Sequence, residues 1–152
     1  MRKFESPEIS FYYPENWTIF VDDGDEHSGE EETNEITLQS PGSSQLTIAL
    51  YDRMEDSNDL LNRTLEVLKA EYEDLEVDSV TSKVGDFSLQ GFDVTFFYLD
   101  LLVVAELRIA ERQDDKILLL LQSESRELED NRDVYDAIML SMLKPEIMEE
   151  VD

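Results

Sequence analysis

The first third of the chain alternates between apolar and polar residues, with the period of two that is typical of half-buried strands. Ile9, Phe11 and Tyr13 are the apolar positions of the first such segment, and Pro14 ends it because proline cannot donate to a β-ladder. Three further strands are expected over residues 17–21, 36–38 and 46–51. Most of the turns between these segments are short, which favours antiparallel pairing of consecutive strands.

The period then changes to that of a helix over residues 59–75. The apolar positions form one stripe and comprise Leu61, Leu65, Leu68, Tyr72 and Leu75. Ser57 lies where an N-cap is expected, and Asp59 is favourable near the positive end of the helix dipole.

Four more strands and a second helix are expected after this segment. The strands cover residues 77–84, 87–99, 103–109 and 117–121. Residues 117–121 are apolar at every position, which predicts a central strand that is covered on both faces. The second helix is expected over residues 129–143, where apolar side chains recur at helical spacing before Pro145.

This order of elements predicts an α+β fold in a single domain that spans residues 1–152. We expect an antiparallel β-sheet with helices on both faces, an α-β-α sandwich, because each helix has one apolar stripe to bury. Residues 22–35 include eight acidic residues and no apolar one, and we expect a mobile acidic loop there. Residues 145–152 are expected to form a loose C-terminal tail.

The chain is strongly acidic, with 38 Asp and Glu residues against 12 Lys and Arg residues and a net charge of −26. Both halves contribute, because residues 1–76 carry 20 acids and 5 bases and residues 77–152 carry 18 and 7. Such a surface repels nucleic acid and anionic membranes, so we exclude both as partners. Two interpretations remain open: a salt-adapted surface on a monomer or weak homodimer, or a docking face for a basic protein.

Cysteine is absent, which excludes disulfides, thiol catalysis and anchoring through a lipidated cysteine. The first residues lack the apolar core of a secretory signal, and the longest apolar stretch, residues 101–105, is far too short to span a bilayer. A cytoplasmic location is therefore expected.

The sequence contains no recognisable catalytic or cofactor-binding motif, so we expect a protein that is not an enzyme and takes no cofactor. His27 is the only histidine, and the chain has neither a Gly-x-Ser-x-Gly elbow nor a phosphate-binding glycine loop. A small hydrolase with paired carboxylates remains an alternative, since acids are abundant. Glu106 and Arg108 are expected to share one sheet face, where we interpret them as part of a cross-strand charge pair.

The acidic segment offers oxygen ligands for a hard cation such as calcium. The candidate metal ligands are Asp23, Asp25 and Glu31. An EF-hand is excluded, because Ser28 stands at the position where that loop requires glycine. A ligand- or cation-binding accessory domain is therefore the alternative function, and a solvated run of charges is the simpler interpretation of the segment.

The late strands carry apolar residues on both faces, and we assign five of these residues as candidates for partner binding. They are Phe97, Leu99, Val104, Leu118 and Leu120. In one interpretation the second helix buries this surface. In the other, part of it stays open as a groove for a hydrophobic segment of another protein.

Residues 11–17, with the sequence FYYPENW, resemble the "strand, Tyr-Pro-x-x-Trp, strand" opening of the PsbP-like superfamily, which also holds the Ran-binding Mog proteins. The segments 91–111 and 137–143 resemble its second half, so the likeness covers residues 9–143. This resemblance implies a helix–sheet–helix sandwich. It implies no common enzymatic activity, because the superfamily includes photosystem accessory subunits, Ran-release factors, lipoproteins and type VI secretion chaperones.

Residues 148–152 read MEEVD and resemble the tail by which cytosolic heat-shock-ninety chaperones engage carboxylate clamps. We attribute this match to chance in a chain rich in glutamate, because nothing else in the sequence resembles that chaperone. The sequence as a whole predicts a non-catalytic protein-binding module, such as a chaperone or an adaptor for another protein.

Overall fold

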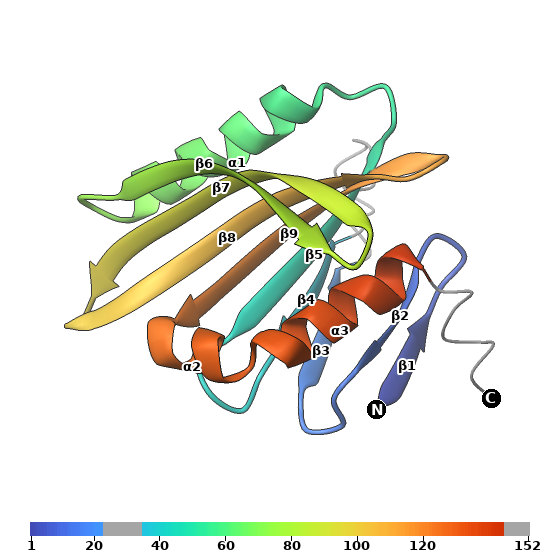
Figure 1. Cartoon of the computed structure of the whole chain (residues 1–152), viewed down its shortest axis with the longest axis horizontal. Coiled ribbons are helices and arrows are strands. Elements are labelled where there is room, and N and C mark those ends of the chain that lie inside the picture. Colours follow the sequence, from blue (N-terminus) through green and yellow to red (C-terminus); the bar gives the residue numbers. More distant parts are fainter. Residues whose placement is uncertain (23–34, 145–152) are drawn as a thin grey trace.

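A computed structural model describes residues 1–22 and 35–144 of the chain. These residues form a seven-stranded sheet, a separate two-stranded hairpin and three helices (Figure 1). The strands are β1 (Arg2–Glu5), β2 (Ser10–Tyr13), β3 (Thr18–Asp22), β4 (Glu35–Gln39), β5 (Gln45–Asp52), β6 (Glu76–Val84), β7 (Phe87–Tyr98), β8 (Leu101–Glu111) and β9 (Asp115–Glu124). The helices are α1 (Ser57–Glu71), α2 (Ser125–Asp130) and α3 (Arg132–Leu143). The large sheet is antiparallel, with the order β3-β4-β5-β9-β8-β7-β6.

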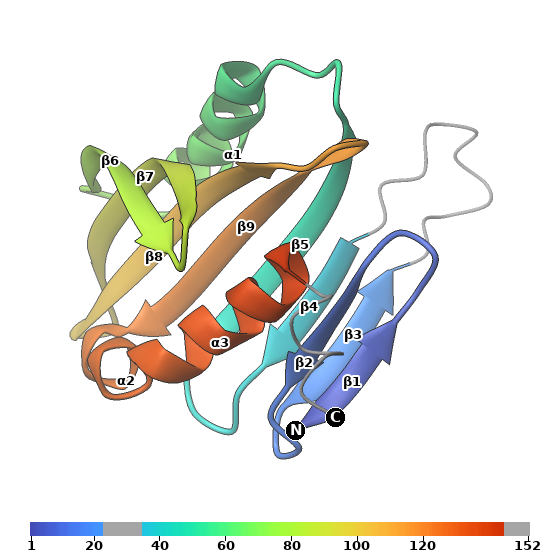
Figure 2. The same ribbon diagram turned by 45° about the vertical axis from the view of Figure 1, so that its right-hand side comes forward.

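Helices cover both faces of the large sheet, because its central strands are apolar on both sides. Strand β9 places Leu119 and Leu121 in the core beneath α3, whereas Leu118 lies in the core beneath α1. The two views agree that α1 and α3 lie on opposite sides of the sheet (Figures 1 and 2). The predicted α+β class and the predicted central strand at residues 117–121 are therefore confirmed.

The β1–β2 hairpin belongs to the α3 layer and not to the large sheet. Phe11 of β2 lies in the same core as Tyr135 and Ile138 of α3. The backbone N–H of Tyr12 donates to Ser141 Oγ at 3.0 Å, which joins the hairpin to the helix. The hairpin and α3 together shield this face of the sheet.

The expected pairing of the first two predicted strands is wrong, because β2 pairs with β1 and not with β3. Trp17 lies between β2 and β3, and its ring contacts the ring of Tyr135 edge-on with centroids 5.9 Å apart. The chain therefore crosses from the α3 layer to the sheet at this residue. Strand β1 itself carries one inward apolar residue, Phe4, and shows too little alternation to be predicted.

Both helices differ from their predicted bounds at the caps. Asp56, and not Ser57, is the N-cap of α1, since its carboxylate accepts the Asp59 N–H at 3.0 Å. The helix ends at Glu71, although Tyr72 still contacts the core beneath α1. The second predicted helix consists of α2 and α3, which are separated at residue 131, and it begins earlier than residue 129.

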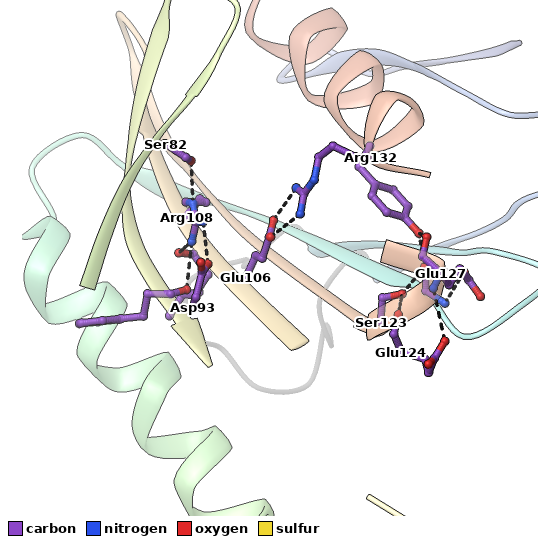
Figure 3. A network of polar contacts seen from close by, with 12 residues as sticks. Ser82, Asp93, Glu106, Arg108, Ser123, Glu124, Glu127 and Arg132 are labelled. Atoms are coloured by element: carbon purple, nitrogen blue, oxygen red, sulfur yellow. Dashed lines mark hydrogen bonds and ion pairs between the residues drawn. The ribbon is translucent and has the colours of Figure 1, made fainter. Parts of the chain in front are cut away.

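The carboxylate of Glu127 ties α2 to the turn between β4 and β5 (Figure 3). It accepts the backbone N–H groups of Ser43 and Ser44 at 2.7 and 3.0 Å and the hydroxyl of Ser40 at 2.8 Å. The Ser44 hydroxyl also contacts this carboxylate and the Tyr135 hydroxyl. Burial alone would raise the pKa of Glu127, but these hydrogen bonds outweigh it and lower the pKa to about 2.

We expect Glu127→Gln to lower the free energy of unfolding at neutral pH by about 2–3 kcal/mol, since several donors lose a charged acceptor. The native pKa of about 2 lies below the ordinary 4.5, so the wild-type stabilisation is complete above pH 4.5 and is lost as the pH falls towards 2. Urea unfolding at several pH values measures both effects. Exposed Glu129→Gln is the matched control, and an equal loss in both variants would contradict the assignment.

Candidate partner-binding face

The sheet face beneath α3 stays open where β7 and β8 extend past the helix layer. Residues paired across antiparallel strands point to the same face, so the register defines this surface. Its successive pairs, which we call the open face, are Gly91–Arg108, Asp93–Glu106, Thr95–Val104 and Phe97–Leu102. Figure 1 shows the β7–β8 hairpin extending beyond α2 at the left of the view. The face therefore continues from the edge of α3 to the end of the hairpin.

The outer end of the β7–β8 hairpin is apolar and exposed to solvent, with Phe97 and Leu102 on the open face and Tyr98 and Leu101 on the opposite face. Five residues, which we call the tip patch, are exposed by the following fractions: Phe97 73%, Tyr98 53%, Leu99 79%, Leu101 53% and Leu102 36%. They are half of the ten large hydrophobic side chains that are exposed in residues 1–22 and 35–144. Single exposed apolar side chains are ordinary, whereas such a concentration in one hairpin makes this end of the molecule a candidate interaction surface.

One of the two residues in the turn of this hairpin is a leucine, whose side chain disfavours the backbone conformation found there. Tyr98 pairs with Leu101, so the loop contains two residues, Leu99 and Asp100, with φ of 50° and 67°. Two positive φ values define a type I′ turn, in which asparagine, aspartate or glycine is preferred. Leucine in the left-handed region is strained by roughly 1–2 kcal/mol. Asp100 suits the turn, but Leu99 does not, and strain of this kind is concentrated at functional sites.

An aromatic cluster on the opposite side of the hairpin supports the patch. The ring of Tyr72 stacks on Phe96 with centroids 4.2 Å apart and meets Tyr98 edge-on at 5.9 Å. Phe96 is itself buried beside Val94 and Leu68. The exposed tip is thus attached to the core beneath α1.

The inner end of the open face is polar and organised by two arginines (Figure 3). Arg108 is only 6% exposed and donates to Asp93 Oδ1 at 2.7 Å and to Ser82 Oγ at 2.8 Å. Its remaining bonds, to the Phe92 and Leu107 carbonyls at 3.0 Å, satisfy the guanidinium. All of these acceptors lie within the fold, so Arg108 offers no free charge to a partner.

Arg132 of α3 forms a two-pronged pair with Glu106, with N···O distances of 2.8 and 2.5 Å. A cleft of about 290 Å³ lies beside this pair, between α3 and the strands β6 to β8. Its polar lining includes Glu106, Arg108, Arg132 and Asp136. Burial raises the pKa of Asp136, as do Glu106 and Asp133, while Arg132 opposes the shift.

The five residues predicted for partner binding do not form one surface. Phe97 and Val104 lie on the open face and Leu99 lies at its tip. Leu118 and Leu120 pair with Ile109 and Leu107 and contact the cores beneath α1, on the opposite face.

The sequence places Leu118 and Leu120 on the wrong face because alternation shows which residues of one strand share a face, but not how that strand is aligned with its neighbour. The predicted common face of Glu106 and Arg108 is confirmed, although their carboxylate and guanidinium partners are Arg132 and Asp93. The sequence candidates do not include Tyr98, Leu101 and Leu102, and the signal that marks these residues is an apolar run on both sides of a hairpin turn.

The residues predicted to bind a cation, Asp23, Asp25 and Glu31, lie outside the described part of the chain, as does His27. Among the residues that are described, no group of three or more His, Cys, Asp or Glu side chains could hold a metal ion. Within the same ranges, no helix is both long and apolar enough to cross a membrane.

A sheet between α1 on one face and α3 with the β1–β2 hairpin on the other is a PsbP-like fold. The chain is similar to the solution structure of the PsbP protein (CyanoP) of the cyanobacterium Synechocystis sp. PCC 6803. The TM-score is 0.60 at 10% sequence identity, and the match covers 92% of this chain and 89% of that one. This likeness confirms the fold that the resemblance to the PsbP-like superfamily implied.

Two further solved structures are similar at lower scores. A crystal structure from Bacteroides thetaiotaomicron has a TM-score of 0.50 and 17% identity over 80% of this chain and 41% of that chain. LpqN, which is involved in cell envelope biogenesis of Mycobacterium tuberculosis, has a TM-score of 0.47 and 16% identity over 86% of this chain and 79% of that one. No protein-family profile and no curated protein matches the sequence.

Replacing Leu99 by asparagine tests whether the turn is strained. We expect Leu99→Asn to raise the free energy of unfolding by about 1 kcal/mol, because asparagine tolerates a positive φ better than leucine does. Thermal and urea unfolding measure the change. The control is Leu101→Asn, an exposed leucine in extended strand, which should bring no gain. A destabilised or unchanged Leu99→Asn would show that the turn carries no strain.

Proposed function

We propose that this chain is a non-catalytic protein-binding module, and that the tip patch holds an apolar segment of another protein. The observation that carries the proposal is the concentration of five exposed apolar side chains at residues 97–102. The unfavourable leucine in the turn supports it, since an asparagine or glycine there would suit the turn better. A chaperone or an adaptor would use such a surface.

The charges around the tip patch indicate the chemistry of the partner. The turn contains Asp100, and the connection between α1 and β6 places Glu73, Asp74 and Glu76 near the same end, since Glu76 pairs with Thr95. Lys69, in the last turn of α1, is paired with Glu66 at 3.6 Å. A partner with bulky apolar residues flanked by Lys or Arg complements this end of the molecule.

A second copy of the chain would fit the tip patch poorly, because it carries the same acidic charge. Two molecules that each carry a net charge of −26 repel one another unless salt screens them. The acidic surface therefore favours a basic segment of a different protein over self-association.

The ion pairs of the open face also argue for binding rather than hydrolysis. The Glu106 carboxylate is paired with Arg132 and the Asp93 carboxylate with Arg108, so the two are engaged within the fold. Ser44 is fully buried, where no substrate reaches its hydroxyl. The open face thus offers surface and charge, and no nucleophile with a neighbouring base.

Selection from a displayed library of random dodecapeptides tests the proposal on the full chain. We expect peptides that combine bulky apolar residues with Lys or Arg, and we expect the double variant Phe97→Thr, Leu102→Thr, which alters the two tip residues paired on the open face, to bind them about tenfold more weakly. Threonine keeps the β-propensity of these exposed positions, so the fold should persist, as thermal unfolding will show.

The matched control is Phe20→Thr, because Phe20 is an exposed aromatic side chain, at 56%, on strand β3 at the other edge of the sheet. Binding by this variant should match the wild type. Selected peptides that bind the double variant as well as the wild type, or a selection that enriches no peptide, would refute the tip patch as a binding site.

A further inference from the structure

The tip patch leads directly into the polar cleft along one line of the open face. Phe97 and Asp93 lie on the same face of β7, four residues apart. At about 3.3 Å per residue, this places the start of the cleft roughly 13 Å from the patch. Thr95 and Val104, both partly exposed, form the surface between them. A bound segment that reaches the patch can therefore continue along this surface to the cleft.

Most charges in the cleft are already neutralised by a neighbour, and Asp136 is the exception among its carboxylates. Glu106 is paired with Arg132, and the Asp93 carboxylate beside the cleft is paired with Arg108. The side-chain carboxylate of Asp136 forms neither a hydrogen bond nor an ion pair with any other residue in the described ranges. Lys83 lines the rim, but its side chain is exposed and is not paired with Asp136.

The surroundings of Asp136 favour an additional cation. Glu106 and Asp133 both repel its negative charge, and only Arg132, which Glu106 already binds, offsets them. Partial burial adds to this, because it penalises an unpaired carboxylate, and the pKa of Asp136 is raised accordingly. A partner ammonium or guanidinium group placed beside Asp136 would relieve the repulsion between these carboxylates.

We propose that the apolar segment held at the tip patch extends into this cleft and places a Lys or Arg side chain against Asp136. This inference rests on the proposed protein-binding function and specifies its partner: a bulky apolar anchor and, at least about 13 Å further along the segment, a basic residue, because the cleft begins at that distance from Phe97. In an extended segment this corresponds to a spacing of at least about four positions, and in a helical segment, which rises 1.5 Å per residue, to at least about nine.

A double-mutant cycle tests the contact, with a library peptide that binds through the tip patch as the probe. We expect Asp136→Asn to weaken its binding about fivefold, and replacement of the peptide's basic residue by methionine to do the same. The two changes together should also weaken binding only about fivefold, because either one already removes the contact. Isothermal titration calorimetry on the full chain measures all four combinations.

Asp130→Asn is the matched control, because it removes the same charge from an exposed position on α2 that does not line the cleft. Its binding should stay within about twofold of the wild type. Asp136→Lys, combined with glutamate at the basic position of the peptide, should restore binding, which keeps the test valid if Asp136→Asn alters the helix. Thermal unfolding of each variant accompanies the titrations.

The outcomes separate this inference from the function on which it rests. Peptides that need Phe97 and Leu102 but carry no basic residue at this spacing, or whose basic residue acts additively with Asp136→Asn, overturn the inference and leave the tip patch as a binding site. If no peptide depends on the patch, both fail together.

Discussion

The fold depends on the burial of both sides of strand β9. A strand with leucine or isoleucine at successive positions exposes apolar surface on two faces, and one layer on each face is needed to remove it from water. Helix α1 supplies one layer, and α3 with the β1–β2 hairpin supplies the other. The second layer ends before β7 and β8 do, since the hairpin that joins these two strands extends beyond α2 (Figure 1). The open face follows from this difference in length.

Several of the few cationic side chains in this acidic protein are already paired with carboxylates within the fold. Arg108, Arg112 and Arg132 each form an ion pair with a carboxylate at 2.7 Å or less, so their charges are neutralised within the fold. Arg108 and Lys116 are among the least exposed side chains of their type, at 6% and 7%. What remains on the outside is a surplus of carboxylates, which sets the sign of any partner more firmly than the net charge alone does.

Much of the fold could be predicted from the sequence, because periods of two and of 3.6 residues are properties of a single element. The strands from β2 to β9 and both amphipathic stripes follow from that signal. Register is not local, so Leu118 and Leu120 were assigned to the same surface as Val104, although they pack against α1. The separation of β2 from β3 depends on Trp17 meeting Tyr135, a contact between residues more than a hundred positions apart. The role proposed for Asp136 could not be predicted from the sequence either, since it depends on the ion pair that Arg132 forms with Glu106 in the folded chain.

The position of the β1–β2 hairpin makes it a suitable site for attaching the molecule to a label or a solid support. Its first strand lies on the far side of α3 from the β7–β8 turn, and both views place residue 1 well away from that turn (Figures 1 and 2). A fluorophore or solid support attached to the β1–β2 hairpin would therefore leave the exposed Leu99 unobstructed. Immobilised molecules would in that way present the β7–β8 turn to the solution.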